Sequence, residues 1–178
     1  MKHSLVLTVI GPDRPGLVET LAQTISEHQA NWLESRMARL AGKFAGVLRV
    51  DVPHDQTQPL TEALGQLQSA GLHVVVESAD DQPTETSPRT LTLTFIGHDR
   101  PGIVRDISHA LAQHGVNVIE LHTQVSSAPM TGEPLFKANA TLHAPSSIPL
   151  DQLRDQLDQV AHQLDIDLTL DEAADASA

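Results

Sequence analysis

The chain has 178 residues, 40% of them hydrophobic, which is enough for one medium-sized domain or two small ones with packed cores. Its formal net charge is −12, from 11 basic and 23 acidic residues, and this opposes direct DNA or RNA binding, which needs a basic surface to displace counterions from phosphates. Cysteine is absent from the sequence, so disulfides, thiolate metal sites and cysteine nucleophiles are excluded.

The first half of the chain predicts four strands and two helices in the order βαββαβ. Leu5 to Ile10 is a β-rich run bounded by glycine, and Pro15 suits the first turn of the helix that follows. Apolar residues at helical spacing give that helix one buried face as far as residues 28–30. The other expected elements are a strand over 32–40, a turn over 41–43, a strand over 44–52 ended by Pro53, a helix over 60–67 ended by Gly71, and a strand over 72–77.

The second half repeats this pattern. An offset of 86 residues (97 − 11) pairs Leu5–Ile10 with Leu91–Ile96 and keeps the match for more than twenty residues, which indicates an internal repeat. The offset then rises to 92, as the pairs Phe44/Phe136 and Pro53/Pro145 show. The second copy is therefore expected to carry about six extra residues around 126–134, in the hairpin between its second and third strands.

The duplication predicts an α+β chain of two ferredoxin-like βαββαβ domains in tandem, each an antiparallel sheet with both helices on one face. We expect the first domain at residues 1–78, a polar and acidic linker at 79–90, the second domain at 91–172 and a flexible tail at 173–178. Open sheet edges invite pairing, so we expect the two repeats to form a pseudo-dimer and the chain to form a homodimer.

Short turn motifs carry a resemblance to a known family. Gly-Pro-Asp-Arg-Pro-Gly at 11–16 and Gly-His-Asp-Arg-Pro-Gly at 97–102 each precede an amphipathic helix and an Asn-led strand, and this arrangement resembles the ACT domain. The stretches 34–44 and 128–136 are similar to those of tandem ACT regulators such as the glycine cleavage system transcriptional repressors. The resemblance implies sensing of a small amino acid, with glycine as the known effector, at interfaces between ACT units. It also implies action through a DNA-binding activator protein.

The same resemblance points to candidate ligand-binding residues in each turn and at the start of the next strand. A helix N-terminus offers unpaired N–H groups and a partial positive charge to a carboxylate, and glycine there leaves the backbone open. Aspartate would hold an α-ammonium group, and asparagine would hydrogen-bond to either end of the ligand. The residues are Asp13, Arg14, Gly16 and Asn31 in the first copy, and Asp99, Arg100, Gly102 and Asn117 in the second.

Structural roles explain the same residues without a ligand. Asp13 and Asp99 would cap the helix or close an Asx-turn. Arg14 and Arg100 would pair with those aspartates in exposed turns. Asn31 and Asn117 would take the left-handed turn between helix and strand, and the glycines and prolines would serve the turns themselves.

The sequence gives little support for metal binding, cofactor binding, catalysis or membrane contact. The ten histidines lack HExxH or similar ligand spacing, so we expect no metal and no cofactor. Nucleophile-elbow, P-loop and dinucleotide motifs are missing as well, which favours a protein that is not an enzyme. Apolar runs fall short of the roughly 20 residues of a membrane span and of a signal peptide, so we expect a cytoplasmic protein without membrane contact.

Two functions remain open at this point. The first is an amino-acid-sensing transcriptional co-regulator that acts through a DNA-binding activator protein. The alternative is a regulatory subunit of an amino-acid or one-carbon metabolic enzyme. A weaker third hypothesis is hydrolase or transferase activity related to formyltetrahydrofolate deformylase, because the turn motif also occurs in the regulatory modules of such enzymes.

Overall fold

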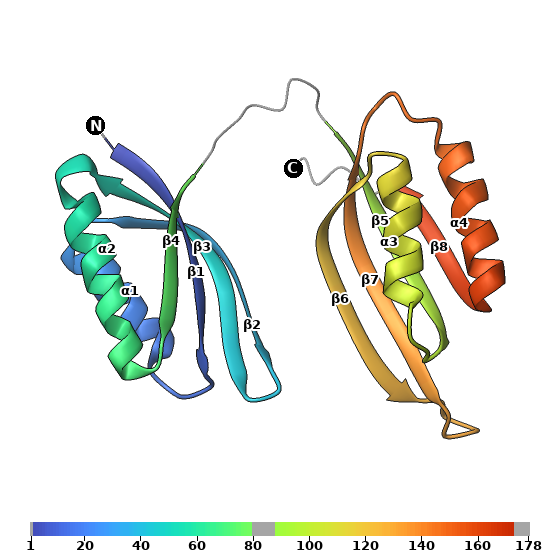
Figure 1. Cartoon of the computed structure of the whole chain (residues 1–178), viewed down its shortest axis with the longest axis horizontal. Coiled ribbons are helices and arrows are strands. Elements are labelled where there is room, and N and C mark those ends of the chain that lie inside the picture. The colour runs from blue at the N-terminus through green and yellow to red at the C-terminus, as the bar shows by residue number, and fades with distance from the viewer. Residues whose placement is uncertain (1, 80–87, 173–178) are drawn as a thin grey trace. The chain divides into compact units, whose positions relative to one another are not determined.

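The chain divides into two compact units, Met1–Gln82 and Pro83–Ala178, within which the computed structural model describes residues 2–79 and 88–172 (Figure 1). Most of the expected linker at 79–90 and the whole expected tail at 173–178 lie outside the described residues. The first strand of the second unit begins at Arg89, so the last two residues of the expected linker belong to a strand.

The first unit folds in the predicted order βαββαβ. Neighbouring strands are antiparallel and follow the order β2-β3-β1-β4 across the sheet. Both helices lie on the same face of this sheet (Figure 1). The elements are β1 (Lys2–Pro12), α1 (Leu17–Glu27), β2 (Asn31–Leu40), β3 (Lys43–Pro53), α2 (Thr57–Gln66) and β4 (His73–Ser78), with the 3-10 helices η1 (His54–Gln56) and η2 (Leu67–Ala70) flanking α2.

Side-chain alternation decides which face of the first sheet is buried. Leu7 of β1 pairs with Leu48 of β3 and Val76 of β4, and residues two apart along each strand point to the same face. The helices add leucine and isoleucine at helical spacing to this face. The resulting core contains Leu5, Leu7, Val9, Leu17, Leu21, Ile25, Leu48, Val50, Val52, Leu60, Leu64 and Leu72.

The second unit repeats the architecture around its own core. Its strand order is β6-β7-β5-β8, again antiparallel throughout. The predicted fold, two tandem ferredoxin-like βαββαβ domains of the α+β class, is therefore confirmed. The elements are β5 (Arg89–His98), α3 (Ile103–Gln113), β6 (Asn117–Ser127), β7 (Pro134–Ala144), α4 (Leu150–Leu164) and β8 (Ile166–Glu172).

Strand lengths and hairpins show where the two units differ from the expected bounds. β1 and β5 extend beyond the apolar runs 5–10 and 91–96, because their pairing with β3 and β7 continues into the polar flanks. Ala41 and Gly42 alone join β2 to β3, whereas six residues, 128–133, join β6 to β7. The longer second hairpin agrees with the change of repeat offset.

The sheet face that points away from the helices, called the open face below, differs in chemistry between the units. In the first unit it carries Ile10, Val47 and Val75, which are 47%, 47% and 57% exposed. At the equivalent places of the second unit, β7 and β8 carry Asn139 and Thr169 instead of the two valines. Where the open face of the first unit carries these two exposed valines, that of the second unit therefore carries polar side chains.

Candidate functional site

Each glycine-containing turn leads into a helix without a side-chain cap. Gly16 is the N-cap of α1 with φ 87°, and Gly102 is the N-cap of α3 with φ 100°. Glycine is needed at both places because other residues rarely adopt this left-handed backbone. Neither helix has a side-chain hydrogen bond at its cap, so the expectation that Asp13 and Asp99 cap the helices is wrong.

The aspartates tie each turn to the neighbouring hairpin. The Asp13 backbone N–H donates to the carbonyl oxygen of Gly42 at 2.9 Å, and its carboxylate forms an ion pair with Arg39 of β2. In the second unit the Asp99 N–H donates to the carbonyl oxygen of Pro134 at 3.0 Å. In each unit this hydrogen bond joins the aspartate that follows the first strand to the hairpin between the second and third strands.

The two arginines point the other way, toward the second helix of their unit. Arg14 donates from Nη2 to the carbonyl oxygen of Ala70, at the end of η2. Arg100 donates from Nη2 to the carbonyl oxygen of Gln163, 3.3 Å away in the last turn of α4. The expectation that these arginines pair with the adjacent aspartates is therefore wrong, because carbonyl groups left open at a helix end accept their hydrogen bonds instead.

The asparagines begin strands β2 and β6 and are exposed. The left-handed residues between helix and strand are Gln29, with φ 57°, and Gly115, with φ 65°. The expectation that Asn31 and Asn117 occupy those turns is therefore wrong, because both lie two residues further on in extended backbone.

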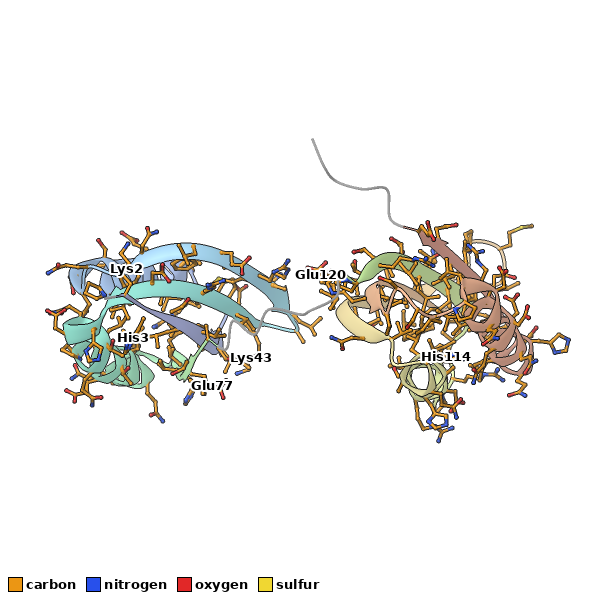
Figure 2. The ribbon with its side chains drawn as sticks, turned by 90° about the horizontal axis from the view of Figure 1, so that it is seen from above. Lys2, His3, Lys43, Glu77, His114 and Glu120 are labelled. Carbon is orange, nitrogen blue, oxygen red and sulfur yellow. The ribbon has the colours of Figure 1, made fainter. Side chains whose placement is uncertain are left out.

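Asn31 also lies far from the turn of its own unit. It pairs with Asp51 of β3, which pairs with Ser4 near the start of β1, whereas Asp13 follows the end of that strand. At about 3.3 Å per residue, the eight steps from Ser4 to Pro12 separate the two sheet ends by roughly 26 Å. Lys2 and Lys43 mark these two ends in Figure 2.

A cavity of about 260 Å³ brings together three of the four candidates of the first unit. Asp13, Arg14 and Gly16 line it, and the first turn of α1 and Phe44 complete the wall. A Cβ atom built on Gly16 would meet nothing within 4 Å, so this stretch of backbone is open to a ligand. The arrangement has the helix N-terminus and the carboxylate that recognition of a small zwitterion requires.

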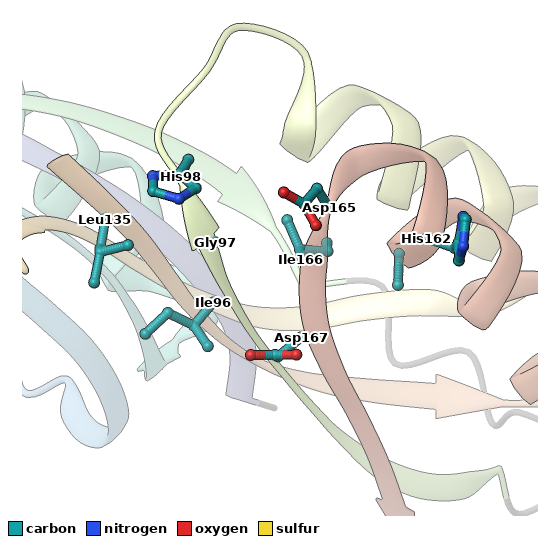
Figure 3. A pocket seen from close by; sticks show the side chains of 9 residues that line it. Ile96, Gly97, His98, Leu135, His162, Asp165, Ile166 and Asp167 are labelled. Carbon is teal, nitrogen blue, oxygen red and sulfur yellow. The ribbon is translucent and has the colours of Figure 1, made fainter. Parts of the chain in front are cut away.

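The second unit has a larger cavity, of about 540 Å³ (Figure 3), and its lining does not include Asp99, Arg100 or Gly102. His98 stands just before Asp99 on the chain, and His162, Asp165 and Asp167 face the cavity from the end of α4 and the start of β8. Sequence reasoning missed these four residues. The sequence signal that could have found them is a difference between the two repeats. Asp167 of β8 pairs with Ile96, whereas the equivalent residue of β4, His73, pairs with Ile10.

Near the second turn, the pKa values of Arg105 and Asp106 are shifted from their usual values. Arg105 donates from Nε to Asp106 Oδ1 at 2.7 Å on the surface of α3. This hydrogen bond, helped by the positive charge, lowers the pKa of the Asp106 carboxyl below its usual value and raises the pKa of Arg105. His98 Nδ1 and Glu133 Oε2 are 3.6 Å apart, both more than half exposed.

The described residues hold no group of three or more histidine or acidic side chains placed to bind a metal ion. Within the same ranges, every helix is too short or too polar to cross a membrane.

Fold and turns together define a tandem regulatory-type module, two ferredoxin-like units in which a Gly-x-Asp-Arg-Pro-Gly turn follows the first strand. The sequence profile of the ACT domain matches residues 3–77 and 89–171. The chain therefore belongs to the ACT domain family, as a tandem ACT-domain protein.

Proteins of two kinds are similar to this chain in sequence. The glycine cleavage system transcriptional repressor of Escherichia coli is 25% identical over 148 residues, covering 82% of this chain and 77% of the repressor. A phosphoserine phosphatase of Mycobacterium tuberculosis is 28% identical over 137 residues, or 74% of this chain, which spans only 33% of the phosphatase. Among solved structures, a protein of unknown function from Galdieria sulphuraria superposes with a TM-score of 0.87 at 28% identity, covering 98% of this chain and 100% of that one.

Proposed function

We propose that this protein is an amino-acid-sensing transcriptional co-regulator that acts in the cytoplasm through a DNA-binding activator protein and has no catalytic activity of its own. One observation supports this above the rest: the match to the Escherichia coli repressor covers most of both chains, whereas the phosphatase match covers a third of that enzyme. The net charge of −12 is consistent with regulation through a protein partner rather than through direct contact with nucleic acid.

The proposed ligand is a small amino acid such as glycine, since ACT domains bind small ligands such as amino acids. Its carboxylate would meet the N-terminus of α1 at Gly16, and its ammonium group would lie near Asp13. Both residues line the 260 Å³ cavity. Asp99, Arg100 and Gly102 form the corresponding turn of the second unit, and Arg14 and Arg100 hold the turns to the second helices.

Asn31 joins this site only if a second copy of the chain supplies it. Within one unit it lies at the opposite end of the sheet from Asp13. β2 is an edge strand whose residues are exposed over most of its length, and an unpaired edge of this kind is suited to pairing with another strand. Antiparallel pairing of two β2 strands in a homodimer would bring Asn31 of the second copy to the turn at Asp13. Pairing of two β6 strands would bring Asn117 of the second copy to the turn at Asp99 in the same way.

Isothermal titration calorimetry against glycine, serine and alanine tests the site. Wild-type protein should bind one of these, and Asp13→Ala and Asp99→Ala should each weaken binding. If binding occurs and both variants bind like wild type, the site assignment is wrong.

Affinity capture from the source cells tests the partner. A DNA-binding transcription factor recovered with the protein supports the proposal. Recovery of a stable metabolic enzyme would instead support the alternative, a regulatory subunit of an amino-acid or one-carbon enzyme, which the similarity to a phosphatase favours. Turnover of formyltetrahydrofolate or phosphoserine by purified protein would contradict the absence of catalysis.

A further inference from the structure

The first turn of the helix that follows each glycine N-cap differs in charge between the two units. The repeat offset of 86 residues pairs Glu19 of α1 with Arg105 of α3, and Thr20 with Asp106. All four residues lie within four positions of the glycine that begins their helix. The two candidate ligand sites therefore carry opposite charges at one equivalent position.

In the second unit, side chains of α3 itself cover the turn. A Cβ atom built on Gly102 would lie 3.2 Å from Arg105 Nη2 and 3.7 Å from Asp106 Oδ2. Arg105 donates from Nε to Asp106 Oδ1 at 2.7 Å, so its guanidinium group is held beside the glycine. A ligand that reaches the N-terminus of α3 must therefore displace this ion pair.

The first unit leaves the same space open. A Cβ atom built on Gly16 would meet nothing within 4 Å. Thr20, which replaces the aspartate, donates from Oγ1 to the carbonyl oxygen of Gly16 at 2.9 Å, so its side chain is tied back to the helix. Glu19 lines the cavity of about 260 Å³ together with Asp13. The open space thus belongs to a cavity whose wall carries two carboxylates.

These two carboxylates differ in what they already bind. The Asp13 carboxylate forms an ion pair with Arg39. Within residues 2–79 and 88–172, the Glu19 side chain has no hydrogen bond and no ion pair. A carboxylate binds an ammonium group through a charge-assisted hydrogen bond, which is stronger than a neutral one. Glu19 is therefore available to accept such a bond from a protonated amine in the cavity.

We propose that Glu19 and Arg105 make the two turns unequal, so that the first unit binds the amino acid tightly and the second unit binds it weakly. This inference rests on the proposed function and deepens it. In the first unit, Glu19 accepts a hydrogen bond from the ammonium group while the N-terminus of α1 holds the carboxylate. In the second unit, the ligand binds only after Arg105 and Asp106 have moved away from the turn. The chain therefore responds in two steps as the amino-acid concentration rises.

Nuclear magnetic resonance titration of the full-length protein with glycine, L-serine and L-alanine in turn tests this inequality. The backbone amides of Gly16 and Gly102 report on the two turns separately. In the wild-type protein, the Gly16 signal should saturate at a ligand concentration about tenfold lower than the Gly102 signal, the usual effect of one hydrogen bond to a charged group. Glu19→Gln should remove this advantage. Glu27→Gln, the same change in the last turn of α1, is the matched control and should leave both affinities unchanged.

Exchange of the first-turn residues between the units gives a reciprocal test. Arg105→Glu combined with Asp106→Thr gives the second turn the residues of the first, so its affinity should rise about tenfold. Glu19→Arg combined with Thr20→Asp should lower the affinity of the first turn to that of the second. Circular dichroism of both double variants checks that the fold is preserved.

The outcomes separate this inference from the proposed function. Equal saturation of Gly16 and Gly102 in the wild-type protein would overturn the inference alone, as would unchanged affinities in both folded double variants. If none of the three amino acids gave saturable shifts in the wild type or in the double variants, the proposed function would fail and this inference with it. Without ligand, nuclear Overhauser contacts are expected between Gly102 Hα and the Arg105 side chain, and their absence would show that the second turn is not covered.

Discussion

Asp13 and Asn31 lie at opposite ends of the first sheet, although both were selected from the sequence as parts of one site. Asn31 pairs through Asp51 with Ser4, and Asp13 follows Pro12 at the other end of the same strand. The separation of roughly 26 Å is several times the length of a small amino acid. One unit alone therefore cannot place both Asp13 and Asn31 on the same small ligand.

The first prediction follows from this geometry. Added ligand should increase the dimer fraction of the wild-type protein, because a ligand that binds only the associated form stabilises it by mass action. Sedimentation velocity at several protein concentrations, with and without glycine or serine, measures the effect. Asn31→Ala should abolish the ligand-dependent increase. A ligand that binds with full affinity to a monomer would contradict the composite site.

Removal of the Arg14 side chain should destabilise the first unit. Arg14→Ala removes the hydrogen bond to the carbonyl oxygen of Ala70 and leaves the end of η2 without that donor. The expected loss is about 0.5–1.5 kcal/mol of unfolding free energy, the usual net value of one hydrogen bond. Urea unfolding followed by the fluorescence of Trp32, the single tryptophan of the chain, reports on this unit because Trp32 packs against its core.

Lys43→Ala is the control for Arg14→Ala. It removes a positive charge from an exposed residue of the same unit without removing a side-chain hydrogen bond recorded in the structure. Equal urea midpoints for the two variants would show that charge, and not the bond to Ala70, accounts for the role of Arg14.

Two glycine substitutions should act in opposite directions. A Cβ atom on Gly46 would lie 2.6 Å from the carbonyl oxygen of Arg36 and would overlap the Met37 side chain, so Gly46→Ala should cost about 1–3 kcal/mol. Gly65 lies in α2 with nothing within 4 Å of its Cβ position. Gly65→Ala should therefore stabilise the unit by about 0.5–1 kcal/mol, through helix propensity. The same urea titration measures both, and a destabilising Gly65→Ala would contradict the open space seen there.

The Asp106 carboxyl should titrate below the usual range of aspartate. Its hydrogen bond from Arg105 favours the ionised form, so the stabilising effect of the pair is present at neutral pH and is lost as the pH falls through the lowered pKa. A ¹³C titration of the carboxyl carbon measures this value. Arg105→Gln should raise the pKa of the Asp106 carboxyl. An unchanged pKa in the variant would show that the hydrogen bond from Arg105 does not cause the lowered value.

Much of the fold follows from local sequence patterns. The β-rich apolar run 5–10 and its repeat at 91–96 predict two central strands, and the helical spacing of Leu17, Leu21 and Ile25 predicts the face of α1 that is buried. Gly16 and Gly102 mark turns that need a left-handed backbone, and the structure has both. These features depend on residues close together in the chain, so a linear pattern is enough to find them.

The sequence by itself determined the duplication, the βαββαβ order and the position of each turn. The duplication follows from comparing the two halves of the sequence, and the other two follow from patterns of residues close together in the chain. Only the tertiary structure decided that Asp13 pairs with Arg39, that Arg14 binds the end of η2, and that Asn31 is remote from both. It also decided that Gly16 and Phe44 line one cavity. These relationships join residues far apart in the chain, and strand register and helix packing set them only once the sheet has formed.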